Sequence, residues 1–271
     1  MPEVQPQYRR TRPPLPGRGG AGRRAGGRAL VLALFLALLA ALPVPGLARQ
    51  EDPAAIAASL AEMLRAARSV VSNHQELIND PKRGDKGLTG DRVVAEAVAA
   101  YRKTTGVDPL ALDPQSRHGR LIRAEMDSIR AVVDRHRDLI DQIGVGFKAF
   151  IPAVFARMVT EEFDARVDDA AIKVTAPPRL VRNRKARPDA WESEIIATRF
   201  SSPQWERGKP ISANAKVEGR PAFRMLVPEY YTPSCLSCHG APAGEVDITG
   251  YEKEGGAAGD LGAVISITLF D

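Results

Sequence analysis

Two cysteines and a histidine stand together near the C-terminal end of this chain of 271 residues. The run is Cys235-Leu-Ser-Cys238-His239, and it holds the only two cysteines in the sequence. Two thiols three residues apart, followed at once by a histidine, form the pattern of covalent haem attachment. Each thiol can add to one vinyl group of a porphyrin, and the adjacent imidazole then reaches one axial face of the iron. The motif predicts one covalent haem c, anchored by Cys235 and Cys238, with His239 as an axial ligand of the metal.

The sequence permits three other interpretations of these residues. A structural zinc site normally has four protein ligands, and the chain offers no second cysteine pair and no His-x3-His pair to complete one. A thioredoxin-like redox pair also carries Cys-x-x-Cys, but it stands in the strand-to-helix turn of a βαβ unit, whereas the flanks here are typical of loops. A plain disulfide is the simplest alternative. The spacing together with His239 favours haem over all three.

The N-terminal segment, residues 1–48, has the parts of a secretory signal peptide. Residues 1–28 are rich in Arg, Gly and Pro, and residues 29–42 are an unbroken apolar run. Gly46 and Ala48 then supply the small residues expected for cleavage after Ala48. The run is short for a membrane span, which needs about 20 residues, so an N-terminal membrane anchor is the alternative. We expect export to the periplasm, which agrees with haem c because this group is attached outside the bacterial cytoplasm.

The basic charge of the chain belongs to this leader. The formal net charge is +5, but residues 1–48 contain seven Arg and one Glu, which leaves −1 for residues 49–271. No basic stripe with interleaved aromatic side chains occurs after residue 48. We therefore expect no nucleic-acid partner.

Residues 49–271 are expected to form a single domain whose character changes near residue 167. Residues 49–166 are mainly helical in pattern, because apolar residues recur every three or four positions between capping signals. Helices are predicted to start after Asp52, Asp91 and Asp113, and a fourth runs to Arg166 with Pro152 at its start or at a kink. The apolar stripe of the first helix comprises Ile56, Leu60, Met63, Ala67, Val71, His74 and Ile78.

Two segments of the helical half resemble each other. When residues 68–80 are aligned with residues 130–142, an arginine, a Val-Val pair, a histidine, an acidic residue and a Leu-Ile pair fall at matching places. The matching histidines are His74 and His136. Amphipathic helices can match in this way by chance, and from sequence we favour chance over a true duplication. Two long helices with the same stripe are expected to pack as an antiparallel pair.

From residue 167 onward the sequence predicts a sheet, with the cysteine motif in a loop. Strands are predicted at residues 171–175, 179–182, 194–200, 212–217, 223–227 and 261–269. Residues 217–221 predict a hairpin turn, and the apolar last strand is predicted to be central and buried. Residues 244–259 are rich in Gly and acidic residues, which is typical of a long loop and would place it over the haem edge. Helices followed by an antiparallel sheet predict an α+β fold.

Several runs of the chain resemble those of one known family. The most specific are residues 228–231, 235–240, 244–245, 247–251, 254–256 and 259–266, and others are residues 78–80, 84–87, 146–148, 150–155, 182–183 and 188–189. They resemble the single-haem c-type cytochromes with a PAS-like sensor fold, over roughly residues 55–270. The chain departs from the family at Arg184 and Ala186. The resemblance implies a PAS-like antiparallel sheet preceded by long N-terminal helices, with one haem c bound in the C-terminal part and used for redox or ligand sensing.

The second axial ligand of the iron is not set by the motif. The resemblance implies a ligand from the first long helix, which in some relatives is a cysteine, and this chain has no cysteine left. His74 on that helix is the first candidate distal ligand, and His136 on the matching helix is the second. The other candidates are His118, Met63, Met126, Met158, Met225, water or an open position. Two histidines give a low potential, a methionine raises it, and an open position admits gas or peroxide.

Four further polar residues are weaker candidates for lining the haem. They are Tyr230, Tyr231, Tyr251 and Arg182, and ordinary packing or surface charge is the favoured explanation for each.

Taken together, the sequence predicts an exported haem protein of the redox or ligand sensor type. No signalling segment is recognised after the sheet, so a sensor is expected to act through a separate membrane signalling protein. The alternative is a single-haem periplasmic electron carrier with a redox partner. A haem enzyme such as a peroxidase is a second alternative, disfavoured because no second haem motif or other catalytic cluster is found. The sequence is also compatible with a homodimer.

Overall fold

The first helix of the structure begins where its capping residues predict. The structure is a computed structural model, and it describes residues 51–271. Helix α2 spans Pro53–Asn73, with the Asp52 side chain accepting a hydrogen bond from Ala54 N at 2.9 Å and Pro53 in the first turn. Apart from His74, the residues of the predicted apolar stripe are buried. The predicted signal peptide, residues 1–48, lies outside the described residues.

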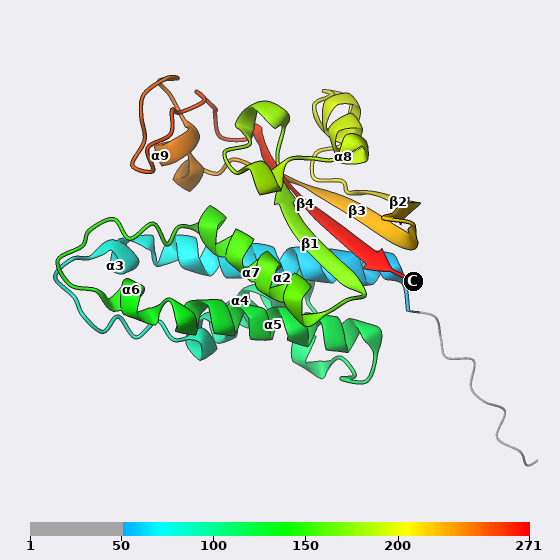
Figure 1. The fold of residues 1–271 in the computed structure, drawn as a ribbon, viewed down its shortest axis with the longest axis horizontal. Helices are drawn as coiled ribbons and strands as arrows, with labels where there is room; N and C mark the ends of the chain where they lie inside the picture. The colour runs from blue at the N-terminus through cyan, green and yellow to red at the C-terminus, as the bar shows by residue number, and fades with distance from the viewer. Residues whose placement is uncertain (1–50) are drawn as a thin grey trace, which may run out of the picture. The chain divides into compact units, whose positions relative to one another are not determined.

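Helices make up the first layer of the protein (Figure 1). After α2 come α3 (Gln75–Asn79), α4 (Gly90–Thr105), the 3-10 turn η1 (Pro109–Ala111), α5 (Arg117–Arg135), α6 (Arg137–Asp141) and α7 (Pro152–Arg166). The third predicted helix begins at Arg117 rather than after Asp113, because the Ser116 hydroxyl caps it by accepting from Gly119 N at 2.9 Å. Among residues 51–271 there is no helix with the length and apolar character that crossing a membrane requires.

The two halves of the helical layer repeat each other in the register that aligns His74 with His136. The first and third predicted helices both break at these histidines, where His74 has φ −98° and ψ 9° and His136 has φ −103° and ψ 10°. In the same register the first residue of α4, Gly90, aligns with the first residue of α7, Pro152. The match therefore extends to the structure, which supports an internal repeat over the chance resemblance favoured from sequence.

The loops that follow the short helices α3 and α6 repeat as well. Lys86 and Lys148 are both buried, and each ammonium donates to a carbonyl three residues earlier, at 2.7 Å and 2.6 Å. The backbone N–H of Lys86 donates to Asp141 Oδ1 at 3.0 Å, and that of Lys148 donates to Asn79 Oδ1 at 3.3 Å. Because these contacts are reciprocal, each half of the repeat holds the loop of the other.

The second layer is a four-stranded antiparallel sheet, so the predicted α+β class is confirmed. Its strands are β1 (Ala170–Thr175), β2 (Ile211–Val217), β3 (Arg220–Tyr230) and β4 (Leu261–Phe270), in the spatial order β1-β4-β3-β2. β4 is central, as predicted, and its residues Ile265, Ile267 and Leu269 pack into the core shared with α2. Strands β2 and β3 meet at the predicted hairpin turn, where Glu218 and Gly219 have φ values of 52° and 81°, both positive as in a type I′ turn.

Two of the predicted strands are wrong. Residues 179–182 overlap the 3-10 turn η2 (Pro178–Leu180), and residues 194–200 belong to α8 (Ala190–Ile195) and the π-helical turn η4 (Ile196–Phe200). Asp189 begins α8 with a capping box, because its side chain accepts from Glu192 N and Glu192 bonds back to Asp189 N. Ile196 and Phe200, four residues apart, then pack on the sheet face away from α2, against Leu226 and Val264.

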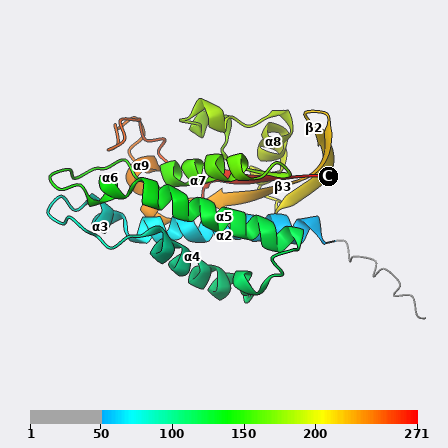
Figure 2. The same cartoon turned by 60° about the horizontal axis from the view of Figure 1, so that its bottom comes forward.

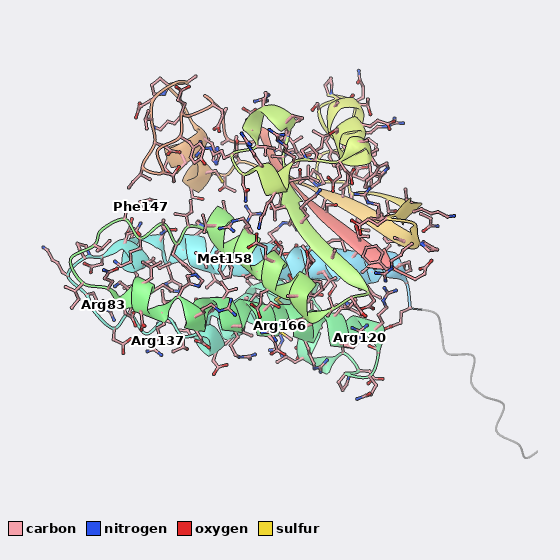
Figure 3. The ribbon with its side chains drawn as sticks, viewed as in Figure 1. Arg83, Arg120, Arg137, Phe147, Met158 and Arg166 are labelled. Carbon is pink, nitrogen blue, oxygen red and sulfur yellow. The ribbon has the colours of Figure 1, made fainter. Side chains whose placement is uncertain are left out.

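The cysteine motif lies between β3 and β4, as predicted. It forms the 3-10 turn η5 (Pro233–Cys235) followed by the single turn α9 (Leu236–His239). Figures 1 and 2 place α9 at the end of the sheet away from the C-terminus. In both views α9 lies near the loop that joins α6 to α7, and Figure 3 labels Phe147 in that loop.

Candidate functional site

The local fold brings the two cysteines onto one helical turn. Strand β3 ends at Tyr230, Pro233 opens η5, and the chain then turns through Cys235 and Cys238. Side chains three residues apart on such a turn lie on the same face. Both cysteines are free thiols with partly exposed side chains, and Thr232 N donates to Cys235 Sγ at 3.4 Å. The turn therefore presents two reduced thiols side by side, which addition to two vinyl groups requires.

His239, at the end of the same turn, is fixed on one side of its ring. Its Nδ1 lies 2.8 Å from Glu254 Oε2, and its ring stacks on Tyr231 with centroids 5.0 Å apart and planes at 17°. Its Nε2 has no hydrogen-bond partner within residues 51–271. A metal-bound histidine commonly gives its second N–H to a carboxylate or carbonyl. His239 therefore has the arrangement of a ligand that binds through Nε2.

Arg182 ties the loop around the motif together. Its Nε donates to Glu254 Oε1 at 3.0 Å, its Nη1 donates to Asp247 Oδ2 at 2.6 Å, and its Nη2 donates to Cys238 O at 2.9 Å. Its guanidinium also lies over the ring of Tyr251, 5.2 Å from the centroid. The sequence favoured ordinary surface charge for Arg182 and ordinary packing for Tyr251. The structure instead makes Arg182 the ion-pairing centre of the site, with Tyr251 stacked against it.

The acidic groups of this cluster stay ionised while the nearby phenol stays neutral. Burial acts to raise the pKa of Glu254, but hydrogen bonds from Arg182 and His239 outweigh it and lower that pKa below its usual value. The pKa of Asp247 is lowered further, because hydrogen bonds from Thr249 and Arg182 outweigh the effect of burial. Burial raises the pKa of Tyr231 to about 12. The site thus has two carboxylates around one guanidinium, with Glu254 reaching His239.

Two glycines hold Tyr231 in place beside His239. A Cβ at Gly256 would lie 2.7 Å from Tyr231 Cε2, and a Cβ at Gly262 would lie 2.2 Å from Tyr231 Cε1. Neither distance is possible for a side chain, so only glycine lets the backbone approach the ring this closely. Tyr230, by contrast, faces away from the motif, where its hydroxyl accepts from Gly208 N at 3.2 Å. Ordinary packing explains Tyr230, as the sequence favoured.

The glycine-rich segment after the motif is an ordered hairpin rather than an open loop. Gly244 N donates to Lys253 O at 2.9 Å, Lys253 N donates to Glu245 O at 2.8 Å, and Asp247 closes the tip by accepting from Thr249 N at 2.7 Å. Val246 and Ile248 at the tip are 63% and 64% exposed. The hairpin therefore presents an apolar tip to solvent while its base carries Glu254 to His239.

The structure places His74 in the helical layer, bonded to a neighbouring helix. Its Nε2 lies 2.7 Å from Glu96 Oε2 of α4. Arg65, nine residues earlier, bonds Glu229 at the end of β3 through its Nε at 2.9 Å. Nine residues are about two and a half helical turns, so the two side chains point from opposite faces of α2. His74 therefore faces away from the strand that leads into the motif.

The other candidate distal ligands also lie in or against the core. His136 Nδ1 bonds Val132 O at 2.8 Å, and its ring packs 5.6 Å from that of Phe150. His118 lies at the start of α5, where Arg120 is labelled in Figure 3 at the end of the molecule away from α9. The methionines are buried in the main core, or packed against it in the case of Met158. The contacts described for these side chains within residues 51–271 do not involve Cys235, Cys238 or His239, and the sixth ligand stays a prediction.

One of the remaining sequence alternatives is a structural zinc site. Among residues 51–271, no group of three His, Cys, Asp or Glu side chains is arranged to hold a metal ion. The zinc alternative therefore gains no support from the described part of the chain.

Residues 49–269 match the Tll0287-like family, described as Tll0287. The chain belongs to the Tll0287-like family. The match takes in the helical repeat, the sheet and the cysteine motif. No curated protein and no solved structure matched.

The side chains of this Tll0287-like domain fit a covalently bound haem. The domain offers two free thiols on one turn, with a histidine nitrogen beside them that has no partner within residues 51–271. The Tyr231 hydroxyl is buried and also lacks a hydrogen-bond partner among the described residues. Cys235, Cys238 and His239 are the residues that would hold the group. The family resemblance included Glu254, but nothing in the sequence assigned it a role beside His239, because it stands 15 residues after that histidine in a loop without periodicity.

Proposed function

We propose that this protein is an exported haem c protein of the redox or ligand sensor type. Cys235 and Cys238 hold one haem through thioether bonds, and His239 ligates its iron through Nε2. The observation that carries the proposal is the pairing of two free thiols with a histidine whose Nδ1 is already bonded to Glu254. The attachment needs no oxidant or reductant, because each S–H adds across a vinyl C=C bond to form one S–C and one C–H bond.

The residues of the chain orient the ligand and stiffen its surroundings. When bound, the haem supplies an iron that changes between ferric and ferrous and can take a second axial ligand. Arg182 holds Glu254 in place, Glu254 keeps the Nδ1 proton of His239 directed away from the iron, and Tyr231 packs against the imidazole face. These contacts keep the imidazole from turning, so Nε2 is held ready for the metal.

The connection between the motif and the helical layer favours a sensor. Glu229, at the end of β3, accepts hydrogen bonds from Arg65 and Arg68 of α2. We infer that a change in charge or ligation at the motif would be passed to this long helix through the end of β3. This agrees with a PAS-like arrangement, in which helices that precede the sheet pass a signal on. The partner would be a separate membrane signalling protein on the periplasmic side, to which the predicted signal peptide would direct the chain.

An electron carrier is the second candidate, and one observation favours it. The exposed apolar tip formed by Val246 and Ile248 lies on the hairpin whose base contacts His239, so a redox partner could dock close to the haem. A haem enzyme such as a peroxidase is a weaker third candidate, because the acids beside the motif, Glu254 and Asp247, are already engaged in hydrogen bonds with Arg182 and His239.

Absorption spectra with and without carbon monoxide separate these functions. A ferrous protein that binds carbon monoxide has an open or displaceable sixth position, which ligand sensing or catalysis needs and an electron carrier does not. We expect binding. A ferrous spectrum unchanged by carbon monoxide, together with a reversible midpoint potential, would replace the ligand-sensor proposal with electron transfer.

A further inference from the structure

We propose that Glu254 is a positioning residue that makes His239 a stronger donor to the iron and so lowers the reduction potential of the haem. The inference rests on the proposed haem c function and specifies how the site sets its potential. It concerns a residue that lies 15 residues after His239 in sequence and acts on the iron only through that histidine.

The Glu254 carboxylate is fixed because both of its oxygens form hydrogen bonds. Glu254 Oε2 lies 2.8 Å from His239 Nδ1, and Glu254 Oε1 accepts from Arg182 Nε at 3.0 Å. The side chains of Glu254 and His239 are only 17% and 25% exposed, so water competes little for the bond. With both oxygens engaged, the carboxylate cannot rotate away, and the proton of the imidazole is fixed on Nδ1.

The charge on Glu254 is not cancelled by the guanidinium beside it. Arg182 is shared, because its Nη1 also donates to Asp247 Oδ2 at 2.6 Å. Two carboxylates around one guanidinium leave one net negative charge in the cluster. That charge acts on His239 through the Nδ1–H bond.

A carboxylate that accepts the Nδ1 proton makes the imidazole more basic at Nε2. A more basic ligand stabilises ferric iron over ferrous iron, and hydrogen bonding around the axial ligands is one of the ways in which a protein sets a haem potential. A backbone carbonyl in the same place would do so less strongly, because it carries no net charge. For any given sixth ligand, the carboxylate therefore lowers the potential relative to the same site without it.

The test is the midpoint potential of Glu254→Gln, with Glu252→Gln as the matched control. Both variants remove one negative charge from the same loop, but the Glu252 side chain is exposed and makes no side-chain hydrogen bond within residues 51–271. We expect Glu254→Gln to shift the ferric-to-ferrous ratio at a fixed potential at least tenfold towards ferrous, a rise of about 59 mV for one electron. Glu252→Gln is expected to change that ratio less than twofold.

Equal shifts in the two variants would overturn the inference, because Glu254 would then act only as a general negative charge. The absence of a shift in Glu254→Gln would also overturn it, because Glu254 would then have no effect on the potential. Both results leave haem attachment itself intact, whereas wild-type protein without covalent haem defeats the proposed function instead.

If Glu254→Gln fails to fold or to take up haem, the wild-type ferrous protein still decides the matter by NMR. We expect a His239 Nδ1–H resonance that exchanges slowly with water, and rapid exchange would contradict the proposed bond.

Discussion

Glu229 and Arg65 join the strand that leads into the cysteine motif to the long helix α2. Glu229 Oε1 accepts from Arg65 Nε at 2.9 Å, and Glu229 Oε2 accepts from Arg68 Nη1 at 3.2 Å. Glu229 stands two residues before Tyr231, on which His239 stacks. One carboxylate therefore lies on the short path between the candidate haem ligand and the helical layer.

Removing this carboxylate charge should loosen the joint between the layers. We expect Glu229→Gln to lower the free energy of unfolding by about 1–3 kcal/mol, because a partly buried hydrogen-bonded charge is lost while its partners stay. Arg68 Nε is already buried without a partner in the described residues, so the loss is not easily relieved. Urea unfolding measures it. The control Glu194→Gln, at an exposed position of α8, should stay within about 0.5 kcal/mol of wild type, and equal losses would contradict the assignment.

The packing of Tyr231 against two glycines predicts a sharp steric effect. Gly262→Ala places a methyl group 2.2 Å from Tyr231 Cε1 and must push the ring away from His239. We expect a loss of about 1–3 kcal/mol in unfolding free energy, the usual effect of overpacking, together with a changed haem spectrum. Gly146→Ala is the matched control, because nothing lies within 4 Å of its Cβ position. A Gly262→Ala protein as stable as Gly146→Ala would show that the ring is not held there.

A buried acid in α5 predicts an unusual dependence of stability on pH. Glu125 is fully buried, neither of its carboxyl oxygens has a hydrogen-bond partner within residues 51–271, and burial raises its pKa well above 4.5. An acid whose pKa is raised in the folded state binds protons better there than when unfolded. Its contribution to stability is therefore most favourable below pH 4.5 and declines as the pH rises towards the folded-state pKa.

The helical repeat supplies the substitution that tests this. In the register that aligns His74 with His136, Met63 is the counterpart of Glu125, and it is buried in the same core. We expect Glu125→Met to raise the free energy of unfolding by about 1–3 kcal/mol at pH 8 and by much less at pH 5. Urea midpoints at the two pH values measure the difference. A variant less stable than wild type at pH 8 would show that the carboxylate has a partner that the described residues do not reveal.

The distal ligand can be tested by removing the histidines singly. His74 bonds Glu96 and His136 bonds Val132 O within the helical layer. On these contacts we expect His74→Ala and His136→Ala to keep the wild-type haem spectrum. Loss of the low-spin bands in either variant would instead support the ligand predicted from sequence.

Local rules predicted much of the fold. Asp52 and Pro53 mark the start of α2, the turn at residues 217–221 joins two strands, and the apolar segment at residues 261–269 is the central strand. Each of these depends on neighbours within a few residues. The strand predicted at residues 194–200 was wrong because a local rule was applied there as well. Their β-branched and aromatic residues suit a strand, but the capping box of Asp189 and Glu192 starts a helix just before them.

The site was only half predictable. Cys235, Cys238 and His239 are adjacent in sequence, so their spacing carries the chemistry. Arg182 and Glu254 reach them only because the sheet brings the segment after β1 and the hairpin before β4 together. Such contacts between segments far apart in the chain leave no periodic trace in a single sequence.

The central claim, a porphyrin joined to the chain by two thioethers, is tested most directly by the intact mass of the exported protein. We predict a coloured product that is heavier than its polypeptide by one haem, with neither cysteine open to iodoacetamide. The double variant Cys235→Ala/Cys238→Ala should lose the added mass and the colour after dialysis. A colourless wild-type protein with the mass of the bare polypeptide, alkylated at both thiols, would contradict the account.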